Sequence, residues 1–289
     1  MQYRRLGKTE YQISPVVFGG VICMDETQAD ADRYVAEAVE SGVNYFDVAP
    51  SYGDAQDRLG PALAPYRQRV YLACKTLERD ASGAKAELLH SLSVLQTDYL
   101  DLYQFHGVNT WEDLNAIFAP GGAMETALWA RREGIIRAIG FSTHNETVAC
   151  AMTEHFRFDT ALFPMNWAMG MELNWGSRIS RIAAEQDMGL LAMKTFIHRQ
   201  YREGDAHPYP KSWAKPIDDE RTDLMQAAMA FAFSRGAAAL VPPGNIRHFR
   251  MMRDLVDGVT AHPLDDAQRA LLRREAELVR NELLFDPPY

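Results

Sequence analysis

The chain has 289 residues, 47% of them hydrophobic, and a formal net charge of −9 at pH 7. This length and apolar content are enough to form a large hydrophobic core. Because the net charge is acidic and the basic residues are scattered, we expect neither a nucleic-acid partner nor binding to an anionic membrane.

The cysteines and the N-terminal residues bear on the location of the protein in the cell. Cys23, Cys74 and Cys150 are odd in number and widely spaced, which is typical of a protein without disulfides in a reducing compartment. The first residues, MQYRRLGKTE, lack the apolar region of a signal peptide. No stretch approaches the length of a membrane span, so a cytoplasmic location is predicted.

Short β-rich runs alternate with helical stretches along the chain. The runs are nearly continuous in hydrophobicity, as in strands that are buried on both faces of a parallel sheet. The predicted strands are Val16–Phe18, Val43–Asp47, Val70–Cys74, Tyr99–Phe105, Ile135–Phe141, Thr160–Pro164, Leu190–Met193 and Ala238–Val241.

Predicted helices fill most of the intervening segments. Thr27 and Asp30 resemble a capping box at the start of the first helix, which ends at Ser41-Gly42. The further predicted helices are Ala84–Leu95, Met124–Arg132, Glu146–Glu154, Arg178–Glu185, Leu224–Ser234, Phe249–Leu255 and Asp265–Leu284.

The alternation of about eight strands with helices predicts a (β/α)8 TIM barrel that comprises residues 1–289 as a single domain. A doubly wound open sheet is the alternative, but no G-x-G-x-x-G motif follows the first strand. Two long stretches, His106–Ala123 and Phe196–Asp219, follow the fourth and seventh strands. In a barrel they would be long loops at the C-terminal rim, where active sites form.

Four side chains at or just beyond the ends of the second, third and fourth strands attract attention: Asp47, Tyr52, Lys75 and His106. Neighbouring strands of a barrel end on the same rim, so these side chains can converge. A nearby ammonium group lowers the pKa of a phenol, and a carboxylate keeps a buried ammonium group charged. The four groups together would form a tuned phenolic acid beside a site for a substrate oxygen.

Taken singly, each of these residues has an ordinary structural explanation. Asp47 can cap a turn, Tyr52-Gly53 can be a plain turn, and Lys75 can be a solvated strand end. His106, followed by glycine, is more often structural than catalytic. The occurrence of all four at successive strand ends is what favours a catalytic site.

Longer motifs around these residues resemble the aldo-keto reductase superfamily over nearly the whole chain. The segment YRRLGKTEYQISPVVFGG is similar to its N-terminal β-hairpin and first barrel strand, and NYFDVAPSYGDAQDRLG to its aspartate–tyrosine signature. VYLACKT and DLYQFHG are similar to its lysine and histidine segments. The resemblance implies an NAD(P)H-dependent carbonyl reductase on a (β/α)8 barrel.

The resemblance also implies a role for each of the four residues. Tyr52 would be the general acid that protonates the carbonyl oxygen, and Lys75 would lower the pKa of Tyr52. Asp47 would pair with Lys75, and His106 would orient the carbonyl group.

Cofactor contacts are implied by segments that resemble the family less closely. In GFSTHNE, Ser142 occupies the position of the carboxamide-binding serine, and Thr143 replaces the usual asparagine. In LLAMKTF, Met193 replaces the tyrosine that stacks on nicotinamide, and Lys194 can meet a phosphate or be a solvated strand end. Asn166 is either a polar contact or a turn residue. Gly20 and Val21, after the first strand, are also expected to contact the cofactor.

The phosphate end of the cofactor would lie at VPPGNIRHFRMMRD. Gly244 and Asn245 precede a helix start, where free backbone N–H groups favour anions. Arg247, Arg250 and Arg253 are candidates for a clamp on a 2′-phosphate, so NADP(H) is the expected cofactor and NAD(H) the alternative.

The substrate is expected to be a small carbonyl compound or the corresponding alcohol. Tryptophans in strand-exit loops suggest an apolar or sugar-stacking pocket, although Trp175 and Trp213 can equally pack their loops down. The expected pocket walls are Cys23, Met24, Val108, Trp111 and Trp167. The oligomeric state is left open between a monomer and a small homo-oligomer.

Two other functions are weighed against the reductase. The first is a nicotinamide-binding regulatory or interaction protein on the same barrel with little turnover. The second is a metal-dependent barrel hydrolase or isomerase, for which His106, His144, His155 and His198 would be ligands. The chain has no H-x-H pair after the first strand and no H-E-x-x-H motif, so no metal site is predicted.

Overall fold

An eight-stranded parallel sheet forms the centre of the computed structural model, which describes residues 1–285. Its strands lie side by side in chain order, so that each strand pairs with the next one along the sequence. They are β3 (Phe18–Gly19), β4 (Tyr45–Asp47), β5 (Tyr71–Thr76), β6 (Leu100–Phe105), β7 (Ile136–Ser142), β8 (Thr160–Pro164), β9 (Gly189–Met193) and β12 (Ala239–Leu240).

The two edges of this sheet meet beside the segment that leads into β3. Val16 forms a parallel bridge with Leu240. The Val17 N–H donates to the carbonyl oxygen of Leu240 at 2.9 Å, and the Leu240 N–H donates to that of Pro15 at 3.0 Å. The predicted barrel is therefore confirmed, and the doubly wound alternative is wrong.

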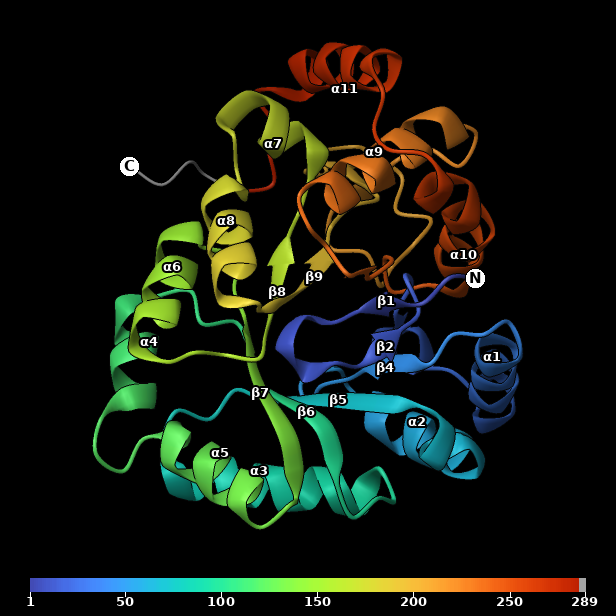
Figure 1. Ribbon diagram of the computed structural model, residues 1–289. Coiled ribbons are helices and arrows are strands. Elements are labelled where there is room, and N and C mark those ends of the chain that lie inside the picture. Colours follow the sequence, from blue (N-terminus) through green and yellow to red (C-terminus); the bar gives the residue numbers. More distant parts are fainter. Residues whose placement is uncertain (286–289) are drawn as a thin grey trace.

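Helices surround the strands on the outside (Figure 1). Each lies between two consecutive strands or follows the last one, which is the βαβ arrangement that parallel neighbours require. They are α1 (Gln28–Glu40), α2 (Ala55–Leu63), α3 (Ala81–Val94), α4 (Trp111–Phe118), α5 (Ala123–Arg132), α6 (Glu146–His155), α7 (Trp167–Leu173), α8 (Ser177–Gln186), α9 (Thr222–Ser234), α10 (Ile246–Ala261) and α11 (Asp266–Val279).

The sequence did not predict α2, α4 or α7. Helix α2 contains Pro61, a residue that usually interrupts a helical pattern. Helix α4 lies inside the stretch His106–Ala123, which was expected to be a loop; Thr110 caps it by accepting from the Asp113 N–H. Helix α10 is longer than predicted, and α11 ends at Val279 rather than Leu284.

The first helix begins where predicted, but without a full capping box. The Thr27 side chain accepts from the Asp30 N–H. The Asp30 carboxylate accepts from the Thr27 hydroxyl at 2.7 Å, whereas a capping box needs it to accept from the Thr27 backbone N–H. The cap therefore satisfies one N–H group of the first turn.

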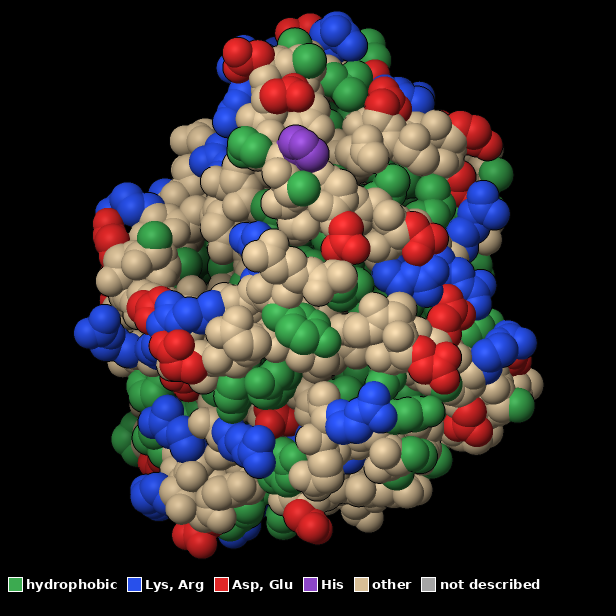
Figure 2. Space-filling view, turned by 45° about the vertical axis from the view of Figure 1, so that its right-hand side comes forward, with side chains coloured by type: hydrophobic (Ala, Val, Ile, Leu, Met, Phe, Trp, Pro, Cys, Tyr) green, Lys and Arg blue, Asp and Glu red, His purple; other side chains and the backbone are tan. Residues whose placement is uncertain are grey.

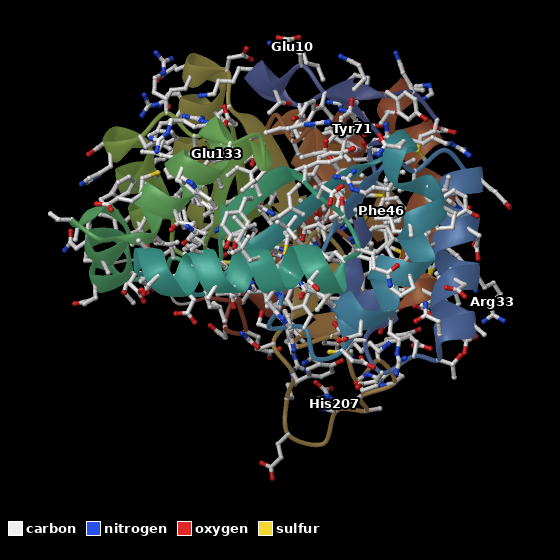
Figure 3. The ribbon with its side chains drawn as sticks, turned by 90° about the horizontal axis from the view of Figure 1, so that it is seen from below. Glu10, Arg33, Phe46, Tyr71, Glu133 and His207 are labelled. Atoms are coloured by element: carbon white, nitrogen blue, oxygen red, sulfur yellow. The ribbon has the colours of Figure 1, made fainter. Side chains whose placement is uncertain are left out.

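An N-terminal hairpin closes one end of the barrel. Its strands are β1 (Arg4–Arg5) and β2 (Gln12–Ile13), which pair antiparallel. Leu6 and Ile13 are fully buried and belong to the core inside the barrel. Figure 3 shows Glu10 of the hairpin at one end of the molecule and His207 at the other.

Successive residues of a strand point to opposite faces, and β4 shows how this divides the core. Tyr45 points into the barrel, where it packs with Leu102, Leu162 and Leu191. Its neighbour Phe46 packs against the outer helices. Both faces of the strands are thus apolar, which explains the continuous hydrophobic runs in the sequence.

The segment Phe196–Asp219 is largely without helix. It contains two short antiparallel strands, β10 (Ile197–Arg199) and β11 (Lys215–Pro216). Among the described residues, no helix is long and apolar enough to cross a membrane. Acidic and basic side chains are interspersed over the face drawn in Figure 2.

Candidate active site

The four side chains selected from the sequence come from neighbouring strands at one rim. Asp47 ends β4, Lys75 is the fifth residue of β5, and His106 directly follows β6. Tyr52 lies in the short segment between β4 and α2. Because these strands are parallel neighbours, their C-terminal ends meet and bring the four side chains together.

Lys75 is fully buried, and its ammonium group forms an ion pair with the Asp47 carboxylate. The other oxygen of that carboxylate accepts a hydrogen bond from Gln104 Nε2 at 2.7 Å. Burial by itself lowers the pKa of Lys75, but the pairing with Asp47 opposes it, and the net result is a raised pKa. The ammonium group therefore stays charged inside the barrel.

Tyr52 lies between this charged pair and the histidine. The Lys75 ammonium is 5.0 Å from the centroid of the Tyr52 ring. The His106 ring meets the Tyr52 ring edge to face, with centroids 5.6 Å apart. Burial raises the pKa of Tyr52, and the opposing effect of Lys75 is smaller. The expected net lowering of this pKa is thus not found, and the phenol holds its proton at neutral pH.

His106 is neutral at neutral pH. Burial, followed by the charge of Lys75, lowers the pKa of its imidazole to about 3. Its Nδ1 atom lies 3.3 Å from the hydroxyl oxygen of Ser51, and Arg79 Nη2 donates to its backbone carbonyl at 2.8 Å. The contact with Ser51 helps to position the ring.

A cleft opens beside Asp47 and Tyr52. Of the residues predicted to contact a cofactor, Val21, Met193, Lys194 and Gly244 line it. The other lining residues are Gly19, Leu162, Ile197, Lys211, Ser212, Trp213, Val241, Pro242 and Pro243.

Two glycines at this rim pack too closely against their neighbours to carry a side chain. A Cβ atom on Gly244 would lie 2.4 Å from Val21 Cγ1, and one on Gly20 would lie 2.6 Å from Val48 Cγ2. Gly244 also lies next to the start of α10, where unpaired N–H groups suit a phosphate. The cleft thus ends beside a helix start that suits a phosphate group.

Three of the residues predicted to contact a cofactor form hydrogen bonds within the protein and are not among the residues that line the cleft. Ser142 Oγ accepts from the Gly107 N–H at 3.0 Å, and the Thr143 hydroxyl donates to Asn109 Oδ1 at 3.2 Å. Asn166 is buried, caps α7 and donates to the carbonyl oxygen of Lys194 at 3.2 Å. Asn166 is thus the N-cap of α7.

The predicted 2′-phosphate clamp is occupied by carboxylates. Arg250 and Arg253 both pair with Glu37 of α1, each at 2.6 Å, and Arg247 pairs with Asp219. Hydrogen bonds from Arg250 and Arg253 lower the pKa of Glu37 to about 2. Asn245 caps α10 by accepting from the His248 N–H at 2.8 Å. The three guanidinium groups thus already have partners.

Most of the predicted substrate walls are not at the surface. Cys23, Val108 and Trp167 are fully buried in the hydrophobic core, so they do not line the cleft as expected. Met24 is partly exposed, and 51% of the Trp111 surface is exposed.

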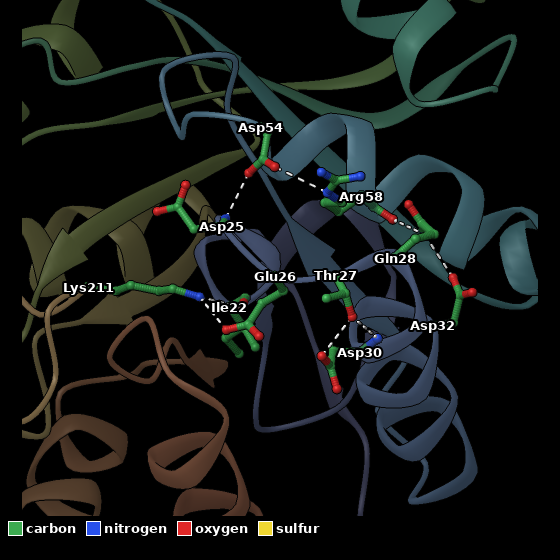
Figure 4. A network of polar contacts seen from close by, with 10 residues as sticks. All are labelled: Ile22, Asp25, Glu26, Thr27, Gln28, Asp30, Asp32, Asp54, Arg58 and Lys211. Carbon is green, nitrogen blue, oxygen red and sulfur yellow. Dashed lines mark hydrogen bonds and ion pairs between the residues drawn. The ribbon is translucent and has the colours of Figure 1, made fainter.

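Lys211 lines the cleft and contacts the segment before α1 (Figure 4). Its ammonium group donates to the Ile22 carbonyl oxygen at 3.1 Å and pairs with Glu26 at 2.6 Å. The segment Phe196–Asp219 is thereby tied to the loop before α1. A second tie joins it to α10, because Asp219 accepts from Tyr209 and lies 3.2 Å from His248.

The sequence did not single out Ser51, Gln104, Lys211 or Trp213 as site residues. Gln104 carries a usable signal, because it is a polar residue two positions before His106 in a largely apolar strand. Lys211 and Trp213 lie in an irregular segment, whose path over the barrel follows from tertiary contacts alone. Within residues 1–285, no three His, Cys, Asp or Glu side chains are close enough to hold a metal ion.

The chain is similar in sequence to proteins of one known family. A family model described as the Aldo/keto reductase family matches residues 16–248. The chain is 33% identical over 162 residues to the aldo-keto reductase YhdN of Bacillus subtilis, covering 49% of this chain and 47% of that protein. It is 34% identical over 135 residues to the methylglyoxal reductase YeaE of Escherichia coli, covering 44% and 45%. These matches span about half the length of the curated relatives.

Solved structures agree over a larger share of the fold. An aldo-keto reductase of Bacillus halodurans in its holo form has a TM-score of 0.71 at 21% identity, covering 96% of each chain. An aldo-keto reductase of Bombyx mori in complex with NADP has a TM-score of 0.70 at 18% identity, covering 99% of this chain and 96% of that one. At these identities the likeness shows the fold alone.

Proposed function

The chain belongs to the aldo-keto reductase family, and on that premise we propose that it reduces an aldehyde or ketone to an alcohol with a nicotinamide cofactor. The family supports an oxidoreductase that acts on carbonyl compounds. The observation that carries the finer proposal is the buried Lys75–Asp47 ion pair beside Tyr52 and His106, at the edge of a glycine-lined cleft.

Each of the four residues has a distinct part in this proposal. Tyr52 gives the proton of its hydroxyl to the carbonyl oxygen, and neutral His106 holds that oxygen with a hydrogen bond from Nε2. The phenolate left on Tyr52 is stabilised by the Lys75 ammonium at 5.0 Å from the ring. Asp47 keeps Lys75 protonated, since a buried amine without a carboxylate would lose its charge.

A bound nicotinamide cofactor would supply the hydride. Val21, Met193 and Gly244 would hold it in the cleft, with its phosphate groups toward the start of α10. The side chains around the carbonyl are preorganised by burial and by the Gln104 and Ser51 contacts, so they need little rearrangement as charge develops on the oxygen.

We propose NADP(H) as the cofactor, with NAD(H) as the alternative. Arg250 and Arg253 are close to the start of α10, but both pair with Glu37. A 2′-phosphate would therefore have to compete with Glu37, whereas NAD(H) would leave this ion pair in place. Titration of the protein with each reduced cofactor, followed by fluorescence, distinguishes the two.

The substitution Tyr52→Phe tests the proposed mechanism. Loss of the phenolic proton donor should lower kcat for aldehyde reduction by roughly 10²–10⁴-fold, with the cofactor dissociation constant changed little. Steady-state kinetics and cofactor titration measure the two quantities. Full turnover by the variant would contradict the role of Tyr52. A wild-type protein that binds cofactor but reduces no aldehyde would favour the regulatory function instead.

A further inference from the structure

Three arginines surround a hollow on the outside of the barrel, where α7, α9 and α11 pack against one another (Figure 1). Arg235 directly follows α9, and Arg269 and Arg273 lie on α11. None of the residues that line this arginine hollow lines the cofactor cleft. The rest of its lining comes from Gly170, Met171, Asn174, Phe231 and Ser234.

The arginine hollow is positively charged, although the chain has a formal net charge of −9. No acidic side chain is among the residues that line it. Within residues 1–285, none of the three guanidinium groups forms an ion pair with a carboxylate. By contrast, each of the three arginines of α10 pairs with one.

Arg235 is half-buried and held in place by uncharged groups. Its Nη2 atom donates to Asn174 Oδ1 at 3.0 Å. Its guanidinium carbon lies 5.2 Å from the centroid of the Phe231 ring, a distance at which a cation is attracted to the aromatic face. Neither contact supplies a counter-charge, and a partly buried charge without one is unfavourable.

Arg269 and Arg273 add two exposed positive charges on one face of α11. They are four positions apart, and like charges at this spacing disfavour a helix. The charge of Arg269 also reaches Arg235, because it adds to the effect of burial in lowering the pKa of Arg235. An anion between the three groups would relieve this repulsion.

Two helix ends offer an ordinary explanation for part of this charge. The last residues of α9 and the C-cap of α7 border the hollow, and a helix C-terminus carries roughly half a negative charge. The two ends therefore offset about one of the three positive charges. Glu146 also favours the charge of Arg235, but it accepts from two backbone N–H groups at the start of α8 and does not line the hollow. The hollow thus keeps a net positive charge.

From this arrangement we infer that the arginine hollow binds a phosphate group of a small anionic ligand. Guanidinium groups bind phosphate oxygens through paired hydrogen bonds. Three of them suit an anion that has several oxygens and nearly two negative charges, as a phosphate group has at neutral pH. A carboxylate offers only one charge and two oxygens. This inference does not depend on the proposed reductase function.

Titration of the isotope-labelled protein with inorganic phosphate tests the inference. Sodium chloride keeps the ionic strength constant, and NMR spectra follow the amide signals of α11 and the arginine Nε–H signals. We expect the dissociation constant to rise by ~10-fold or more in the double variant Arg269→Gln/Arg273→Gln, as for loss of charge-assisted contacts. Both positions are exposed, so the substitutions should not disturb the fold. Arg235→Gln should weaken binding to a similar extent.

The control is Arg274→Gln. Arg274 is an exposed arginine of the same helix that does not line the hollow. Its substitution changes the net charge by the same amount as Arg235→Gln, and the dissociation constant should stay within about twofold of the wild-type value.

Three results would overturn the inference. The first is an equal dissociation constant in the wild type and in the double variant. The second is a set of signals that move only beside Gly244 and Asn245, which would assign phosphate to the cofactor cleft. The third is binding of acetate as tight as that of phosphate.

A titration with glycerol 3-phosphate distinguishes two sources of the phosphate group. Tighter binding than that of inorganic phosphate, lost in the double variant, indicates a phosphate ester as the ligand. Equal binding of the two indicates that the hollow recognises the phosphate group alone. Neither titration needs turnover, so the site is tested even if the wild type reduces no carbonyl compound and the reductase proposal fails.

Discussion

At the scale of single residues, the centre of the candidate site is an ion pair that is buried away from solvent. Lys75 is fully buried, and Asp47 is its carboxylate partner. Removal of either partner would leave a buried charge unpaired.

The substitution Asp47→Asn should reveal the structural part of this role. It leaves the buried Lys75 ammonium without a counter-charge, and removal of one partner of a buried pair lowers the free energy of unfolding by about 3–5 kcal/mol. The double variant Asp47→Asn/Lys75→Met removes both charges and should be more stable than Asp47→Asn alone. Urea denaturation measures the difference. A double variant that is less stable than the single one would argue against an unpaired charge as the cause.

Two partly buried histidines should make the stability depend on pH. Burial lowers the pKa of His106 to about 3 and that of His144 to about 4, whereas an unfolded histidine titrates near 6.5. Between these values the unfolded chain binds more protons than the folded one, so stability should fall as the pH is lowered from about 6.5 to 4. The slope is at most about 1.4 kcal/mol per pH unit for each histidine.

Chemical denaturation at several pH values between 7 and 4 checks this slope. In His144→Gln one titrating group is removed, so the free energy of unfolding should change less steeply over the same range. An unchanged slope in this variant would show that other groups dominate the acid sensitivity.

At the scale of elements, the contact between α1 and α10 bears on cofactor choice. Glu37 of α1 holds both Arg250 and Arg253 of α10. The structure therefore leaves the expected 2′-phosphate clamp neutralised by a residue from a neighbouring helix.

The substitution Glu37→Gln should free these arginines for a phosphate. We expect the ratio of NADPH affinity to NADH affinity to rise by roughly 3- to 10-fold, as for the gain of one charge-assisted contact. Fluorescence titration with both cofactors measures the ratio. Glu40→Gln removes the same charge from an exposed position of the same helix and serves as the control. A ratio that rises equally in both variants would indicate a general effect of charge.

Element prediction succeeded where the local pattern and the tertiary structure agree. All eight barrel strands were predicted within a few residues, because burial on both faces leaves a continuous apolar run. Helices α2, α4 and α7 were missed. These three are short, at nine, eight and seven residues, and α2 contains a proline, so their amphipathic patterns are weak and packing stabilises them.

At the scale of the whole molecule, closure of the sheet creates the site. The bridge between Val16 and Leu240 joins the first and last strands, so that residues from β4, β5 and β6 lie on the same rim as Lys194 and Gly244. The hairpin covers the opposite end with Leu6 and Ile13. One end of the barrel is thereby closed, and the cleft lies at the other.

The sequence by itself determined the eight strands, the barrel and the grouping of Asp47, Tyr52, Lys75 and His106 at neighbouring strand ends. These features depend on local hydrophobic patterns and on strand order, both of which can be read along the chain. Only the tertiary structure decided that Cys23, Val108 and Trp167 are core residues, that acidic residues occupy the arginines of α10, and that arginines from separate segments surround one hollow. Burial and charge pairing depend on residues far apart in the chain, and no local pattern contains that information.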